Sequence, residues 1–171
     1  RIDIFMVGEF DDYQVLQALH RFPLEGRQID LQFSYSQPYV NVVKEKIEPR
    51  QSSQSILQLG YQFPCQYGDK DYFALIVFNA MFGEFAHSAL FTTLREKEGL
   101  AYSISSQFDI FTGLLEVYAG IEKSNRNQAM RGISRELNYI KLGRFSSSLL
   151  NQTKKIIRMN ALLSEDHALT L

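Results

Sequence analysis

The sequence predicts an α+β fold, a two-layer sandwich in which an antiparallel-rich sheet is covered by helices. Two neighbouring segments, 102–108 and 115–121, alternate apolar and polar residues on either side of Gly113, which is typical of an antiparallel hairpin. The segments with helical periodicity come in consecutive pairs, and such helices pack together on a sheet. A length of 171 residues suits one core, so we expect a single domain over residues 1–171.

The N-terminal part predicts a strand followed by a helix. An apolar run from Ile2 to Val7 ends at Gly8 and is short enough for a buried strand. Asp11 or Asp12 can then cap a helix, which Pro23 and Gly26 would stop. The apolar positions of that helix are Val15, Leu16, Leu19 and Phe22. Residues 27–50 are mixed and polar, so we expect a connector with a brief extended segment at 40–43.

The middle of the chain predicts a strand and two helices. Residues 57–63 alternate between apolar and polar or small side chains, which is typical of a half-buried strand. Residues 72–82 are apolar around most of a helical circumference, so they predict a central core helix. A shorter helix is expected at 88–95, ending near Gly99.

Two further helices are expected after the hairpin. Ser124 is predicted to cap a long helix that Gly143 breaks, and Ser146 to cap the last one. The apolar stripe of the long helix consists of Ala129, Met130, Ile133, Leu137 and Ile140.

The composition excludes several classes of function. A formal net charge of −1 gives no electrostatic footprint for nucleic acid, and no apolar run is long enough to cross a membrane. The first residues lack the features of a signal peptide, and a single cysteine, Cys65, fits a reducing compartment, so we expect a cytoplasmic protein. The absence of an initiator methionine predicts that the chain is a fragment of a larger subunit.

A metal site is not expected in this chain. A catalytic zinc needs about three protein ligands and an open position. His20, His87 and His167 are scattered and fall in no zinc motif, so each is interpreted as a surface or loop residue. Cys65 could serve as a nucleophile only beside a histidine, and a small buried thiol is as common an outcome. No glycine-rich phosphate loop is present either, so no cofactor is expected.

Residues 79–106 carry a recognisable pattern. A core helix leads into a loop with Gly83, a short helix starts at Ser88-Ala89-Leu90-Phe91, and the run Arg95-Glu-Lys-Glu-Gly-Leu-Ala-Tyr102 enters a strand. This pattern resembles the C-terminal domain of the M16 metallopeptidases (insulinase, pitrilysin and processing-protease family), whose domains have the LuxS/MPP-like metallohydrolase fold. The resemblance extends more loosely over nearly the whole chain.

The resemblance implies a clamshell peptidase. One half carries an inverted zinc motif, and the other contributes an arginine and a tyrosine that contact the peptide. Arg95 and Tyr102 match these two positions, and Gly83, Ser88 and Gly99 would support them. A phenol hydroxyl can donate a hydrogen bond to the oxyanion of peptide hydrolysis. Zinc is expected in the partner half, so this chain should be inactive alone.

The loop departs from the family pattern. It has fewer glycines, and Ala89 stands where arginine is usual, which is similar to the non-catalytic bacterial members. In those members a subunit without the motif is paired with one that has it. The resemblance therefore implies a bacterial, cytoplasmic subunit whose partner is an N-terminal M16 domain or a zinc-bearing subunit, with peptide as substrate and a dimer of full-length subunits.

Other interpretations stay open. Arg95 could pair with Glu98 or complement the end of its helix, and Tyr102 could be ordinary strand packing beside Ile104 and Phe108. At the level of function, the chain could be a scaffold that only stabilises a catalytic partner, or an isolated peptide-binding module.

Overall fold

The computed structural model describes residues 4–6, 8–23, 36–37 and 39–165. The chain forms two compact units, one from residues 1–34 with 163–171 and the other from residues 35–162. The assignment of residues 1–171 to a single domain stays a prediction.

The first unit contains helix α1 (Asp12–His20). The predicted cap is confirmed at Asp11, because its carboxylate accepts hydrogen bonds from the backbone N–H of Tyr13 and Gln14, at 2.9 and 3.2 Å. The predicted strand over residues 2–7 is wrong for residues 4–6, which pair with no other described residue, and Phe5 is 84% exposed. A strand needs a partner edge for its backbone groups. The remainder of that predicted strand, and Gly26, lie outside the described residues.

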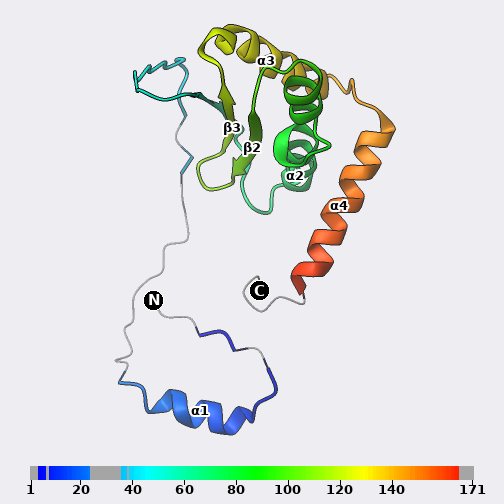
Figure 1. The fold of residues 1–171 in the computed structure, drawn as a ribbon. Coiled ribbons are helices and arrows are strands. Elements are labelled where there is room, and N and C mark those ends of the chain that lie inside the picture. The colour runs from blue at the N-terminus through cyan, green and yellow to red at the C-terminus, as the bar shows by residue number, and fades with distance from the viewer. Residues whose placement is uncertain (1–3, 7, 24–35, 38, 166–171) are drawn as a thin grey trace. The chain divides into compact units, whose positions relative to one another are not determined.

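The second unit is built on a sheet of three antiparallel strands (Figure 1). They are β1 (Ser55–Gln62), β2 (Ser103–Asp109) and β3 (Leu114–Ile121), in the order β1-β3-β2. The predicted hairpin of β2 and β3 is confirmed, and Gly113 takes a φ of 66° in its turn. The extended segment expected at 40–43 is not a strand in the described residues.

The two faces of the sheet differ because side chains alternate along each strand. The inward face carries the apolar residues, and on β3 these are at most 1% exposed: Leu115, Val117, Ala119 and Ile121. The outward face is exposed or half-buried and mostly polar, with Gln58 on β1, Gln107 on β2, and Glu116 and Tyr118 on β3, although Ile56 of β1 also lies on it and is 81% exposed. Only the inward face packs into the core.

Helical segments from four parts of the chain contribute to that core. Helix α2 (Tyr72–Asn79) continues into a π-helical turn, η1 (Ala80–Glu84), and a second π-helical segment, η2 (Phe91–Lys97), precedes β2. Helix α3 (Arg126–Lys141) follows β3, and α4 (Ser147–Glu165) follows α3. Fully buried side chains of η1, η2 and α3, including Phe82, Leu94 and Ile133, meet the inward face of the sheet, which confirms the α+β class.

The helix ends agree with the sequence at one predicted cap and differ at the other. Ser146 accepts a hydrogen bond from the backbone N–H of Leu149 at 3.1 Å, as predicted. Ser124 does not cap α3, because it lies in the 3₁₀ turn η3 (Lys123–Asn125) and its hydroxyl donates to Glu122 at 3.4 Å. Among the described helices, none combines the length and the apolar character that crossing a membrane requires.

Candidate functional site

The run from Arg95 to Tyr102 connects the end of η2 to the start of β2. The backbone N–H of Glu98 donates to the carbonyl of Thr93 at 2.9 Å, and that of Leu100 donates to Leu94 at 2.8 Å. Gly99 lies between them at φ 62°, a left-handed conformation that glycine adopts without steric cost. The turn predicted at Gly99 is therefore present, and it directs the chain into the sheet.

Tyr102 lies at the end of the sheet where β2 begins and β3 ends. Its backbone N–H donates to the carbonyl of Gly120 at 2.8 Å, which fixes its main chain to β3. Tyr102 is 50% exposed, and its hydroxyl donates to Oε1 of Glu122 at 2.8 Å. The hydrogen bond to Glu122 is the main reason that the pKa of Tyr102 is raised, and burial and the carboxylate charge act in the same direction.

A pocket of about 210 Å³ lies at this point. Its walls are formed by the turn and the end of β3: Gly99, Leu100, Ala101, Tyr102, Glu122 and Asn125. The phenol therefore borders a hollow in the surface. The interpretation of Tyr102 as ordinary strand packing does not account for this exposure.

Arg95 has a different environment. Its side chain is exposed, and its guanidinium carbon lies 4.5 Å from the centre of the Phe91 ring, within reach of a cation–π interaction. Among the described residues no ion pair joins Arg95 to Glu98, which pairs with Arg135. Arg95 does lie in the last turn of η2, where its charge complements the end of the helix, as the other alternative held. Arg95 and Tyr102 lie at opposite ends of the connection between η2 and β2. In the described part of the chain, no hydrogen bond or ion pair joins their side chains.

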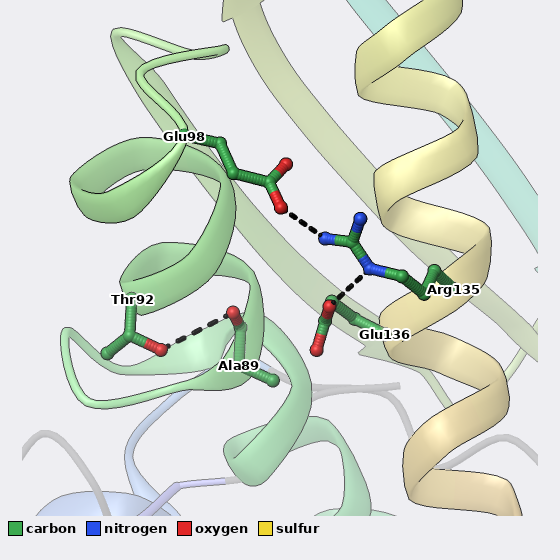
Figure 2. Close-up of polar contacts among 5 residues, drawn as sticks. All are labelled: Ala89, Thr92, Glu98, Arg135 and Glu136. Atoms are coloured by element: carbon green, nitrogen blue, oxygen red, sulfur yellow. Dashed lines mark hydrogen bonds and ion pairs between the residues drawn. The ribbon is translucent and has the colours of Figure 1, made fainter.

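Arg135 of α3 ties the turn to the helix layer, as Figure 2 shows. Its Nη2 lies 2.6 Å from Oε1 of Glu98, and its Nε lies 2.9 Å from Oε1 of Glu136, a residue that is 8% exposed. The hydrogen bond to Glu136, followed by the one to Glu98, raises the pKa of Arg135. We call Arg135, Glu98 and Glu136 the clamp. A second pocket, of about 450 Å³, lies beside it and includes Arg131.

Gly83 is not the loop glycine that the sequence indicated. It lies within η1, and a β-carbon built on it would be 2.8 Å from the backbone nitrogen of Ser106 on β2. The hydroxyl of Ser106 donates to Asn79 at 2.7 Å, and the amide of Asn79 donates to Glu84 at 3.0 Å. Gly83 thus allows the π turn to approach the strand that Tyr102 precedes.

Ser88 lies in the connection between η1 and η2. Its carbonyl accepts from the hydroxyl of Thr92 at 2.9 Å, and the same hydroxyl is 3.4 Å from the carbonyl of Ala89 (Figure 2). Its own hydroxyl is buried and has no hydrogen-bond partner among the described residues. Ser88 therefore supports the backbone of this connection and borders neither pocket.

Of the remaining candidates, His87 and Cys65 belong to the second unit and line neither pocket. His87 makes a 2.9 Å hydrogen bond with the buried Thr153 of α4, and burial lowers the pKa of His87. His20 is exposed, and His167 lies outside the described residues.

Cys65 is buried, and desolvation, with Asp69 and Asp71 nearby, raises the pKa of its thiol, which fits a structural residue. Within the described ranges, no three His, Cys, Asp or Glu side chains are grouped to hold a metal.

Two features of the sheet and its end escaped the sequence analysis. Glu122 was not singled out, because its contact with Tyr102 depends on how β2 and β3 end. A second cluster spans all three strands: Gln58 donates to Tyr118 at 2.8 Å, Tyr118 donates to Glu116 at 3.2 Å, and Gln107 donates to Glu116 at 3.1 Å. The alternation along each strand predicts that these side chains lie on the outward face. Which of them become neighbours depends on the register in which the three strands pair.

Comparison with known proteins gives a consistent result. Residues 1–157 match the sequence model of the family described as the peptidase M16 inactive domain. The chain is 38% identical over 169 residues to "Probable inactive metalloprotease YmfF" of Bacillus subtilis (strain 168), an alignment that covers 98% of this chain and 40% of that protein.

Comparison with solved structures agrees with the sequence matches. The crystal structure of a conserved protein from Enterococcus faecalis V583 has a TM-score of 0.87 and 40% identity, and the match covers 94% of this chain and 38% of that one. The peptidase M16 inactive domain from Pseudomonas fluorescens is similar in fold, with a TM-score of 0.58 and 23% identity over 65% of this chain and 27% of its own. The chain thus spans about two fifths of the length of its first relatives.

Proposed function

Because the chain belongs to the peptidase M16 inactive-domain family, we propose that it is the non-catalytic, C-terminal wall of a peptide-cleaving chamber. The opposing wall would be an N-terminal M16 domain or a zinc-bearing partner subunit. In this proposal Tyr102 and Arg95 contact the peptide, and the whole assembly is a bacterial, cytoplasmic processing-type hydrolase.

The observation that carries the proposal is the position of Tyr102. It is one of the residues that line a pocket on the surface, and it is half exposed, so its side chain can reach a bound peptide. The outward face of the sheet carries polar side chains, among them Glu116, Tyr118 and Gln107. Such a face offers donors and acceptors to an extended peptide along the direction of the strands.

The side chains present indicate which roles in peptide cleavage this chain would have and which the opposing half would have. The described residues do not supply a zinc-ligand set, so the metal would belong to the opposing half, where it would supply the activation of the attacking water. The phenol of Tyr102 would donate a hydrogen bond to the carbonyl oxygen as it gains negative charge. The guanidinium of Arg95, supported by the Phe91 ring, would hold the peptide by its carbonyl groups.

Turnover of the reconstituted assembly tests this proposal. The full-length subunit and a zinc-bearing M16 partner are combined, and cleavage of fluorescein-labelled casein is measured. We expect Tyr102→Phe to lower kcat about 100-fold, the usual effect of removing one oxyanion donor. Tyr67→Phe is the matched control, since Tyr67 is 78% exposed and borders neither pocket, and it should leave turnover unchanged.

Two outcomes separate the proposal from its rival. If Tyr102→Phe and Arg95→Ala both cleave like the wild type, the chain contributes no contact to catalysis, and the scaffold interpretation is favoured. If Arg95→Ala raises KM while Tyr102→Phe lowers kcat, the two residues have the separate binding and transition-state roles proposed here.

A further inference from the structure

The hydroxyl of Tyr102 is already engaged in the structure. It is 2.8 Å from a carboxylate oxygen of Glu122, and both side chains line the same pocket. Both ends of this pair are fixed by the sheet, because Tyr102 directly precedes β2 and Glu122 directly follows β3. The backbone bond from Tyr102 to Gly120 holds the two strand ends together at 2.8 Å. The contact is therefore set by the register of β2 and β3.

A phenol has one hydrogen to donate. While it donates to Glu122, it cannot donate to a peptide oxygen, so the two bonds exclude each other. A carboxylate accepts a stronger hydrogen bond than a neutral peptide carbonyl does. A substrate carbonyl in its ground state therefore competes poorly for the phenol, whereas an oxygen that carries negative charge competes on more equal terms.

From this geometry we propose that Glu122 is a positioning residue for Tyr102, which aims the phenol into the pocket and keeps its hydroxyl from a neutral peptide carbonyl. The inference rests on the proposed function and names the residue that regulates it. Glu122 touches neither the peptide bond nor a metal in this account. Its effect is to reserve the phenol for the charged transition state, which is the difference on which catalysis depends.

The first test reads the phenol directly and needs no activity. In this chain labelled with ¹³C at the tyrosine ring, the titration of Tyr102 is followed by NMR in the wild type and in Glu122→Gln. Because the bond to Glu122 and the carboxylate charge raise the pKa of Tyr102, the substitution should lower it towards its ordinary value. Glu116→Gln is the matched control, since Glu116 accepts a hydrogen bond from Tyr118 on the same strand and should leave Tyr102 unaffected.

The second test uses the full-length subunit with its zinc-bearing partner and fluorescein-labelled casein. Glu122→Gln weakens the competing acceptor, so we expect KM for casein to fall about fivefold, the ratio that corresponds to about 1 kcal/mol between a charged and a neutral hydrogen bond. In the background of Tyr102→Phe the same substitution should change KM by less than about twofold, because no phenol is left to release.

The outcomes distinguish this inference from the proposed function. If Tyr102→Phe lowers kcat but Glu122→Gln changes neither the Tyr102 titration nor KM, the positioning role is wrong and the function stands. If Glu122→Gln lowers the pKa of Tyr102 but Tyr102→Phe leaves turnover intact, the contact exists and the proposed function is wrong.

Discussion

At the scale of single residues, two glycines shape the connection that leads to the site. Gly99 and Gly83 are both glycines of the recognised pattern, yet they serve different purposes. Gly99 is needed for its left-handed backbone, whereas Gly83 is needed because Ser106 occupies the space of a side chain. The sequence could indicate the first role from the end of a helical pattern. It could not indicate the second, since the neighbour comes from a distant strand.

A substitution at Gly83 should therefore be costly for stability. We expect Gly83→Ala to lower the free energy of unfolding by about 1–3 kcal/mol, the usual cost of forcing a methyl group into a packed contact. Gly60→Ala is the matched control, because Gly60 is also a glycine of the second unit but a β-carbon added to it would meet nothing within 4 Å. Urea denaturation followed by far-UV circular dichroism measures both. Equal stability of the two variants would contradict the close approach of η1 to β2.

Tyr102 could be predicted as a site residue from the sequence, whereas Glu122 could not. The run from Arg95 to Tyr102 was recognisable as a pattern, and the structure gives Tyr102 an exposed position at a pocket. Glu122 lies 20 positions away and has no motif of its own. Only the pairing of Ser103 with Gly120 brings the two side chains together.

At the scale of elements, the clamp joins the turn between η2 and β2 to helix α3. Glu98 is the member of the clamp that lies in the turn, and Arg135 reaches it from α3 (Figure 2). Glu136 is mostly buried and has Arg135 as its cationic neighbour. The clamp therefore serves two purposes, because it fixes the turn and neutralises a carboxylate inside the helix layer.

Substitution of Arg135 tests whether it neutralises the carboxylate of Glu136. We expect Arg135→Met to destabilise the chain by about 1–2 kcal/mol, because Glu136 would stay buried without a partner while the exposed contact with Glu98 contributes little. Thermal or urea unfolding measures the change. The double variant Arg135→Met with Glu136→Gln should recover part of the loss, since no uncompensated charge is left. A double variant that is as unstable as the single one would show that the carboxylate is not the cause.

Prediction of the elements succeeded where the side-chain period was clear. The strand at 57–63 alternates throughout, and the hairpin of β2 and β3 alternates except at Ser106, a buried polar residue on the inward face; both elements are present. The helices at 72–82 and 88–95 were predicted without a distinction between types of helix, and each overlaps a π-helical segment. Wider turns of this kind depend on tertiary packing, as at Gly83, and helical periodicity does not distinguish them.

At the scale of the whole molecule, the sequence predicted the class of fold and the family, and the match over residues 1–157 confirms the family. The strand order β1-β3-β2 could not be predicted, because β1 lies far from β3 along the chain and no turn joins them. The strand expected at 2–7 was argued from an apolar run alone, and its described residues, 4–6, are exposed. A run of apolar residues predicts burial only where a partner surface is present.

The central claim is that Tyr102 faces bound peptide. The most direct test replaces Tyr102 with p-benzoylphenylalanine in the subunit, assembled with the zinc-bearing M16 partner that we propose, and irradiates it in the presence of fluorescein-labelled casein. Phe73, which is 74% exposed on α2, is replaced in the same way as a control. We predict a fluorescent crosslink from position 102 and none above background from position 73. Equal labelling at both positions, or none at position 102, would contradict the claim.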